Sequence, residues 1–280
     1  METGQKITEQ TTNIDELSSH ILSIQVSLNG LSFCMLESDS NTIIYFRSES
    51  FQKKLNPQEL LERLDVIITE DSELSKSIQS VKVIYANELS VLVPNSLFNE
   101  EHLADYLKFN TRILQTDFLA FDAIPSNDSM CVYVPYVNIN NYLYEKFGAF
   151  NYMHASSILI ETILNLEKNA EEQKMYVHVG IKYFEIVVVD NNSLILYNTF
   201  EFKTKEDFIY YILFTAEQLQ LNPETIQLAL LGHISEADEL FEIAFKYIRH
   251  VQLIEPTIKF EIDPSISKDI SNLFILLNSF

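Results

Sequence analysis

Ile24 to Phe46 decides the fold, and it reads Ile-Gln-Val-Ser-Leu-Asn-Gly-Leu-Ser-Phe-Cys-Met-Leu-Glu-Ser-Asp-Ser-Asn-Thr-Ile-Ile-Tyr-Phe. Apolar and polar residues alternate from Ile24 to Leu28 and again from Leu31 to Met35, which predicts two strands. Asn29-Gly30 between them is a strong hairpin signal, because both residues tolerate positive φ. The turn Asp39-Ser40-Asn41 then leads to a third apolar run. The stretch therefore predicts a three-stranded antiparallel meander.

A similar pattern returns from Met175 to Phe200. Placing Val26 on Val177, an offset of 151 (177 − 26), superimposes the two meanders without a gap and makes five of twenty pairs identical. The identical pairs are Val26 with Val177, Phe33 with Phe184, Asp39 with Asp190, Asn41 with Asn192, and Ile44 with Ile195. After each meander the sequence predicts a helix, a strand, a helix and a further strand. We infer a duplicated βββαβα unit; the alternative is two unrelated meanders in one α+β chain. A last helix is predicted from Asp263-Pro264 to about Asn278.

The composition is that of an acidic globular protein. The 280 residues are 47% hydrophobic and 21% charged, enough for one large domain or two of ordinary size. The chain has 40 acidic and 19 basic side chains, which give it a formal net charge of −21. Such a surface repels phosphate backbones and anionic lipid, so neither nucleic acid nor a membrane surface is an expected partner.

Cysteine usage and hydropathy predict a soluble cytoplasmic protein. Cys34 and Cys131 both lie in apolar strand-like runs, where a reduced core thiol is expected. Met1 to Gln5 lacks the basic region of a signal peptide. The most apolar helix candidate, Phe208 to Ala216, is much shorter than the roughly 20 residues that a membrane span needs.

The duplicated unit resembles the actin-like ATPase fold of sugar kinases, heat-shock chaperones and actin. The resemblance implies an α/β protein with two ribonuclease H-like βββαβα domains, whose mixed sheets are flanked by helices. These domains would span residues 1–154 and 155–280, with an inter-domain helix at about 156–168. More narrowly, the chain resembles an uncharacterised bacterial family catalogued as a domain of unknown function. The segment from Val134 through Phe150 to His154 and the following helix is also similar to pilus and secretion scaffolds of the superfamily.

The resemblance also implies where a nucleotide would bind. In the superfamily, the first turn of each meander carries Asp-x-Gly, and a Gly-Gly turn follows a late strand. The matching positions here are Ser27-Leu28-Asn29, His178-Val179-Gly180 and Gly232-His233. A vestigial cleft would be lined by Ser27, Asn29, Gly30, His178, Gly180, Gly232 and His233. Both carboxylates are missing, and phosphoryl transfer needs anionic ligands that hold Mg²⁺.

Other chemistry has little support in the sequence. The chain has only five glycines, which excludes a glycine-rich phosphate loop, and its six histidines show no pair at metal-ligand spacing. His178 is expected on the face of a strand or on a cleft wall, with a structural role or a ligand contact both open.

Three functions compete. The first is a non-catalytic actin-like scaffold or adaptor that binds a protein partner, and the negative charge favours a basic one. The alternative is a divergent ATP-binding protein or ATPase of the superfamily. The third is a homodimeric structural protein that uses the exposed edge of a meander. The first is preferred, which predicts no enzyme activity and no cofactor, with ATP and Mg²⁺ disfavoured; whether the protein is a monomer or a homodimer stays open.

Overall fold

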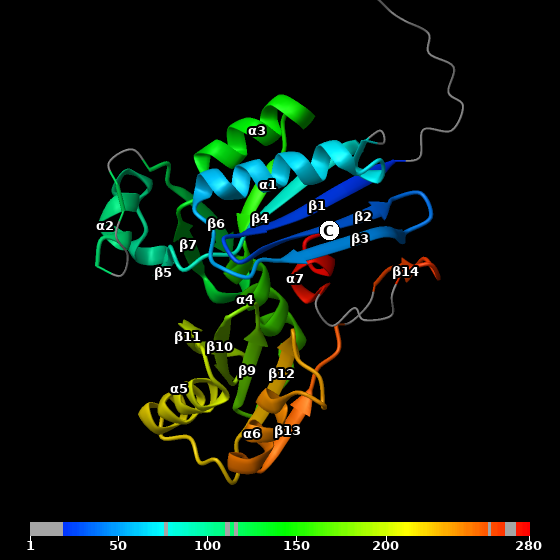
Figure 1. The fold of residues 1–280 in the computed structure, drawn as a ribbon. Helices are drawn as coiled ribbons and strands as arrows, with labels where there is room; N and C mark the ends of the chain where they lie inside the picture. The colour runs from blue at the N-terminus through cyan, green and yellow to red at the C-terminus, as the bar shows by residue number, and fades with distance from the viewer. Residues whose placement is uncertain (1–18, 76–77, 110–112, 115–116, 257–258, 267–272) are drawn as a thin grey trace, which may run out of the picture.

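The computed structural model describes residues 19–75, 78–109, 113–114, 117–256, 259–266 and 273–280. Figure 1 shows two large sheets, one above the other, with the helix α4 (Ala155–Leu166) running between them. A small third sheet lies to one side. The short C-terminal helix α7 (Phe274–Leu277) returns to pack on the first sheet.

The first sheet has six strands in the order β14-β3-β2-β1-β4-β8. They are β1 (His20–Ser27), β2 (Gly30–Glu37), β3 (Thr42–Ser50), β4 (Ile78–Tyr85), β8 (Asn151–His154) and β14 (Glu261–Ile262). The meander β1-β2-β3 is antiparallel, and β4, β8 and β14 join it in parallel. Helices α1 (Pro57–Glu70) and α3 (Val137–Phe147) cover its outer face (Figure 1). In a capping box, the side chain of Asn56 accepts a hydrogen bond from the backbone N–H of Glu59, and the side chain of Glu59 accepts one from the backbone N–H of Asn56. This arrangement fixes where α1 begins.

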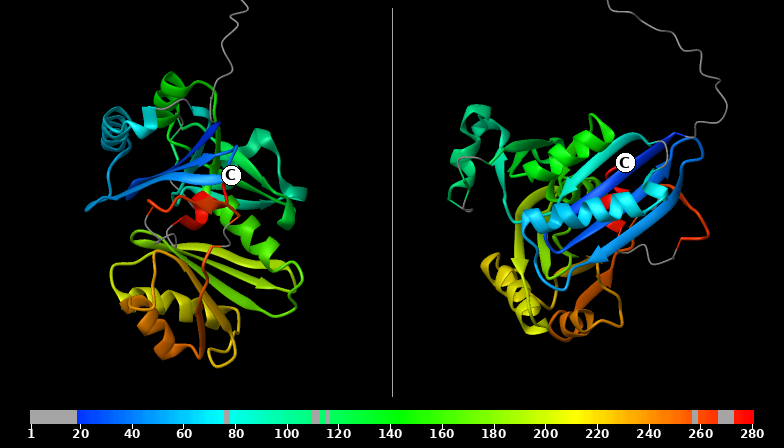
Figure 2. Two further views of the ribbon diagram at one scale, coloured as in Figure 1. Left: turned by 90° about the vertical axis from the view of Figure 1, so that its right-hand side faces the viewer. Right: turned by 45° about the horizontal axis from the view of Figure 1, so that its top comes forward.

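The second sheet has five strands in the order β11-β10-β9-β12-β13. They are β9 (Lys174–Val179), β10 (Tyr183–Asp190), β11 (Ser193–Glu201), β12 (Gln227–Gly232) and β13 (His250–Leu253). Helices α5 (Lys205–Gln218) and α6 (Glu239–Tyr247) lie on its lower side, opposite α4 (Figures 1 and 2). Strand order and direction thus repeat those of the first sheet, as the duplicated unit predicts.

A small module is inserted between β4 and α3. Its strands β5 (Ser90–Pro94), β6 (Ala120–Ile124) and β7 (Ser129–Tyr133) form an antiparallel sheet in the order β5-β7-β6. After Asn99 the chain forms a 3-10 turn followed by five helical residues, α2 (Leu103–Leu107). The module has an apolar cluster of its own.

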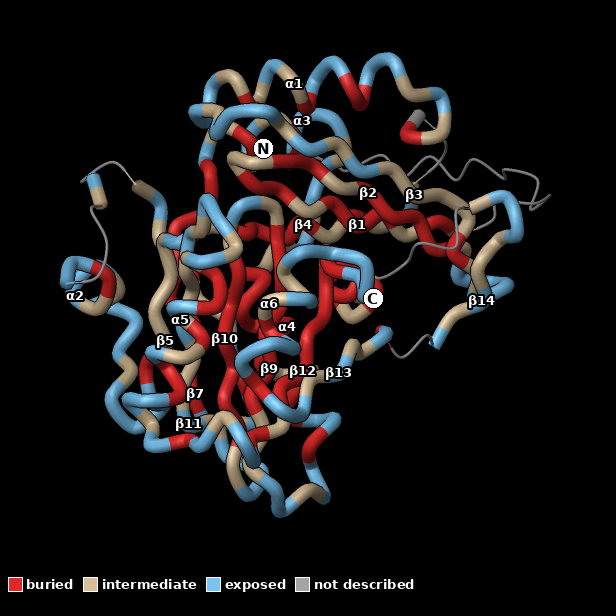
Figure 3. The backbone as a smooth tube through the Cα atoms, turned by 60° about the horizontal axis from the view of Figure 1, so that its bottom comes forward, coloured by how far each residue is buried: buried red, intermediate tan, exposed pale blue. Residues whose placement is uncertain are grey.

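The largest buried cluster joins the two halves. It contains strands of the first sheet, most of α4, α7 and residues of the second sheet such as Tyr176, Val187 and Leu231. Figure 3 shows this buried material concentrated in the central strands of both sheets. Cys34 and Cys131 are buried here, and burial raises the pKa of each thiol to about 12. The proposed division between residues 154 and 155 stays a prediction.

The hairpin pairing corrects the alignment of the two meanders. Ser27 pairs with Gly30 in the first hairpin, and the Gly180 N–H bonds to the Tyr183 carbonyl in the second. The offset at the first turn is therefore 153 (180 − 27) rather than 151. The loop over residues 38–41 has four residues, whereas the matching loop over residues 191–192 has two, so the offset of 151 holds for β3 and β11 but not for the first two strands of the meanders. An ungapped alignment could not reveal this difference in loop length.

The last helix is shorter than predicted. Asp263 and Ser265 form a turn in which Asp263 accepts hydrogen bonds from the backbone and hydroxyl of Ser265. Helical residues are found only from Phe274 to Leu277, and residues 267–272 of the predicted helix lie outside the described residues. In the described parts of the chain, no helix is long and apolar enough to span a membrane.

Candidate functional site

The first hairpins of the two sheets meet at one small cavity. Five of the seven residues predicted for the vestigial cleft line it; they are Ser27, Gly30, His178, Gly180 and His233. Asn29 lines a neighbouring cavity that shares Ser27. Gly232 lies under His178, since a Cβ on Gly232 would come within 3.1 Å of the His178 Nε2 atom. Each cavity is small. The centres of water molecules can occupy only about 30 Å³ of it, which is room for a few waters.

Side chains of the protein itself fill the space over the hairpin glycines. A Cβ on Gly180 would lie 2.4 Å from the ring of Tyr183, so the residue must be glycine for Tyr183 to pack there. A Cβ on Gly30 would lie 2.6 Å from the Glu49 carbonyl oxygen and 3.0 Å from Ile181 Cδ1 of the opposite hairpin. Glycine normally lets a backbone approach a phosphate closely. At these two hairpins it instead allows internal contacts.

Gly232 is explained in the same way. Its φ of +90° is a conformation that side chains rarely adopt, and a Cβ there would lie 2.4 Å from the Val179 carbonyl oxygen. The same Cβ would lie 2.9 Å from the His178 ring. Gly232 thus permits the close approach of β12 and β9 at their ends.

A buried contact between a histidine and a glutamate lies behind the cavity in the second half. His178 Nδ1 is 2.9 Å from Glu185 Oε2 across the β9–β10 ladder, and both side chains are almost fully buried. The Tyr197 hydroxyl donates to Glu185 Oε1 at 2.6 Å and lies 3.1 Å from Thr199 Oγ1. Burial raises the pKa of Glu185, but the hydrogen bonds and charge of His178 and the Tyr197 hydroxyl outweigh it and hold this pKa below its usual range.

The corrected alignment places neutral residues at the same positions of the first half. Gln25 of β1 pairs with Ser32 of β2, at the positions where His178 of β9 pairs with Glu185 of β10 in the second half. The side chains of Gln25, Ser32 and His178 all line the cavity. Ser32 Oγ is 2.9 Å from Ser48 Oγ. Neither hairpin places an acidic side chain in the cavity.

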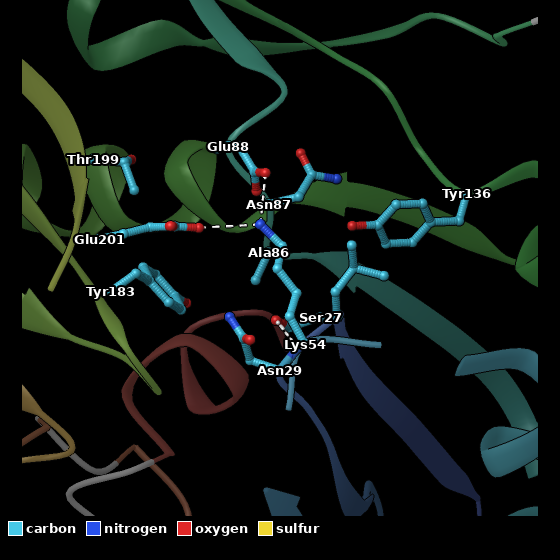
Figure 4. A pocket seen from close by; sticks show the side chains of 11 residues that line it. Ser27, Asn29, Lys54, Ala86, Asn87, Glu88, Tyr136, Tyr183, Thr199 and Glu201 are labelled. Carbon is cyan, nitrogen blue, oxygen red and sulfur yellow. Dashed lines mark hydrogen bonds and ion pairs between the residues drawn. The ribbon is translucent and has the colours of Figure 1, made fainter. Parts of the chain in front are cut away.

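Two carboxylates that sequence reasoning missed lie beside the neighbouring cavity. Lys54 Nζ donates to Glu88 Oε1 at 2.9 Å and to Glu201 Oε1 at 3.0 Å, as Figure 4 shows. Burial lowers the pKa of Lys54, but these two hydrogen bonds raise it above its usual value. Tyr136 and Tyr183 lie across this cavity (Figure 4). Lys54 and Glu201 come from different halves, so this pair ties the halves together.

Known proteins resemble this chain in sequence and in fold. Residues 9–251 match the family described as "Protein of unknown function (DUF3822)". The chain belongs to this family. Among curated proteins, none is significantly similar in sequence to this DUF3822 chain.

The fold of the DUF3822 chain is that of the actin-like ATPases. A Bacteroides thetaiotaomicron protein "with actin-like ATPase fold and unknown function" is 25% identical, with a TM-score of 0.72 over 85% of this chain and 91% of that one. The "PilM-PilN type IV pilus biogenesis complex" contains a chain that is 11% identical, with a TM-score of 0.60 over 94% of this chain and 97% of that one. The predicted fold class and family are therefore confirmed.

The DUF3822 chain also buries a polar cluster between α4 and the inserted module. Asp122 accepts hydrogen bonds from the His154 backbone N–H at 2.7 Å, from the Ser157 hydroxyl at 2.8 Å and from the Tyr133 hydroxyl at 3.1 Å. His154 Nδ1 lies 2.6 Å from Ser156 Oγ, and burial lowers the pKa of His154 to about 4. No group of three metal-ligating side chains is found among the described residues. The sequence contains no spacing that would predict this cluster.

Proposed function

We propose that this protein is a non-catalytic scaffold or adaptor with an actin-like fold, which binds another protein and has a degraded nucleotide site. The observation that carries the proposal is the filled space over the hairpin glycines. Tyr183 packs on Gly180, and Ile181 reaches across to Gly30. A bound triphosphate would need both places.

The carboxylates near the cleft support the same proposal. Magnesium-dependent phosphoryl transfer needs free anionic oxygens beside the phosphates. Glu88 and Glu201 share a cavity with Ser27 and Asn29, but one oxygen of each is hydrogen-bonded to Lys54. The carboxylate of Glu185 is buried, and its two oxygens are already hydrogen-bonded to His178 and Tyr197.

A protein partner is supported by charge and by fold. With a net charge of −21, the chain attracts basic proteins at long range and repels nucleic acid. The similar pilus chain occurs in a complex named for PilM and PilN. We propose a cytoplasmic location, which the two free and buried thiols support.

Thermal unfolding in the presence of ATP tests the proposal. We expect the Tm to be the same without ligand, with millimolar ATP and Mg²⁺, and with ATP plus EDTA. A ligand at about 100 times its Kd stabilises the folded state by about 2.7 kcal/mol, so binding would be visible. A shift of several degrees that EDTA abolishes would overturn the proposal in favour of a divergent ATP-binding protein.

Two variants make this test sharper. Tyr183→Ser removes the ring over Gly180, and Lys54→Met releases Glu88 and Glu201. We expect neither variant to gain binding, because the hairpins still lack the acidic side chain. Magnesium-dependent ATP binding by the double variant would show that these side chains alone block the site.

A further inference from the structure

We propose that the outer edge of β11 is a docking site for an extended, basic segment of a partner protein, which adds to the second sheet as a sixth strand running parallel to β11. The inference rests on the proposed scaffold function and assigns its binding surface. It comes from comparing equivalent edges of the two sheets.

The two edges are protected differently. β3 and β11 are the third strands of the two meanders, and each has nine residues; β14 covers the outer side of β3, whereas β11 is the edge of its sheet. β3 has two charged residues, Arg47 and Glu49, which are held in ion pairs with Asp71 and Arg63, and β14 pairs with its first two residues. β11 has the sequence Ser-Leu-Ile-Leu-Tyr-Asn-Thr-Phe-Glu, with no proline and no charge before its last residue. In the described parts of the chain, no strand pairs with its outer edge.

The first sheet shows what such an edge accepts. β14, a short extended segment, runs parallel to β3 and pairs Glu261 with Thr42 and Ile262 with Ile43. The N–H groups of Glu261 and Asp263 donate to carbonyl oxygens of the β3 side at 3.0 Å. Pairing of this kind needs main-chain groups and little sequence specificity. By the same geometry, the open edge of β11 accepts an extended segment.

An aromatic row beside β11 offers contacts for the side chains of an added strand. Phe200 of β11 stacks on Tyr211 of α5 with ring centroids 4.7 Å apart, and Tyr210 and Phe214 continue the row. Tyr210 is 58% exposed and Phe214 43% exposed. Alternate side chains of a strand point to one face, so every second residue of the segment would face α5.

Charge decides between a partner segment and a second copy of the chain. Two copies would each bring a net charge of −21, and their mutual repulsion opposes pairing of β11 with β11. β11 itself carries no cation: Asp190 precedes the turn into it, and Lys54 is the cation that pairs with Glu201 at its other end. A segment that carries lysine or arginine complements the negative charge of the chain.

Hydrogen–deuterium exchange of the full chain tests the proposal with a defined probe. The probe is the peptide Thr-Val-Lys-Val-Thr-Val-Lys-Thr at about 2 mM, which detects affinities in the millimolar range. We expect exchange of the β11 amides to slow by about threefold or more, because new strand hydrogen bonds protect them. The peptide Thr-Val-Glu-Val-Thr-Val-Glu-Thr should protect them much less.

Variants locate the effect. Ile195→Lys places a positive charge on β11, where Ile195 is 46% exposed, and should abolish protection by the basic peptide. Val66→Lys is the matched control, since Val66 is 37% exposed on α1 and should leave protection unchanged. If Ile195→Lys does not fold, Asn198→Lys at another exposed position of β11 replaces it.

Three outcomes would overturn the proposal: no protection of β11, protection that Ile195→Lys leaves intact, or wild-type dimers in sedimentation that Ile195→Lys dissociates. The third would assign the edge to a second copy of the chain. ATP binding would overturn the proposed function and leave the peptide result unaffected. A failed peptide test would remove the edge site and leave the ATP result unaffected.

Discussion

The two halves share the strand order of their meanders but differ in the polar row that each places at the cleft. In the second half, His178, Glu185 and Thr199 lie side by side across three strands. In the first half the same three positions are Gln25, Ser32 and Ser48. One polar row therefore contains a buried carboxylate, that of Glu185, and the other is neutral. The difference teaches that the fold tolerates either kind of row and does not require an acidic side chain facing the cleft.

Truncating the charged row should have the largest effect. Glu185→Ala leaves the buried His178 and Tyr197 side chains without their partner, and each buried polar group left unsatisfied costs about 1–3 kcal/mol. Ser32→Ala removes only a hydroxyl that pairs with Ser48, at a cost of about 1 kcal/mol. Urea unfolding of both variants measures the two values. Equal losses of unfolding free energy in the two variants would mean that the contacts of Glu185 stabilise the protein no more than the contact between Ser32 and Ser48.

Acid should destabilise the protein through His154, at the junction of the halves. Burial lowers the pKa of His154 to about 4, so the folded state binds its proton less readily than the unfolded state. Stability is then fully present above the unfolded pKa of about 6.5 and is lost as the pH falls to about 4, by about 3 kcal/mol. In urea unfolding at several pH values, His154→Gln should flatten this part of the pH dependence. An unchanged slope in the variant would assign the acid sensitivity to other groups.

Much of the fold could be predicted from the sequence, because its signals are local. The alternation around Asn29-Gly30 indicates a hairpin whatever lies elsewhere in the chain. The equivalence of Ser27 with Gly180 could not be predicted from the sequence. The loop after β2 is two residues longer than the loop after β10, so the identical residues in and after these loops align at a different offset from the strands before them. The contact of Lys54 with Glu88 and Glu201 joins three distant segments, and no spacing indicates it.

Two double-mutant cycles compare the glycines of the two hairpins. Gly180→Ala should destabilise the protein by about 1–3 kcal/mol, because the new methyl group overlaps the Tyr183 ring. Tyr183→Ser should relieve much of this loss, giving a coupling of about 1 kcal/mol or more in urea unfolding. Gly30→Ala overlaps the Glu49 backbone as well as Ile181, so Ile181→Ala should relieve it little. Similar coupling in both cycles would contradict the difference in packing.

The smallest effect concerns the ion pair that joins the halves. Lys54 and Lys53 are neighbours, but Lys54 contacts Glu201 of the second half, whereas Lys53 contacts Glu59 of its own half. The Lys54 pair is partly exposed, so Lys54→Met should cost at most about 1 kcal/mol, and Lys53→Met, in a more exposed pair, should cost less than that.

Hydrogen exchange separates these two variants where stability cannot. Only Lys54→Met should speed exchange at the end of β11 near Glu201, because only this change loosens the contact between the halves. In about 1 M salt the Debye length falls to about 3 Å, and the difference between the variants should shrink. If Lys53→Met speeds hydrogen exchange near Glu201 as much as Lys54→Met does, the ion pair between Lys54 and Glu201 does not hold the two halves together.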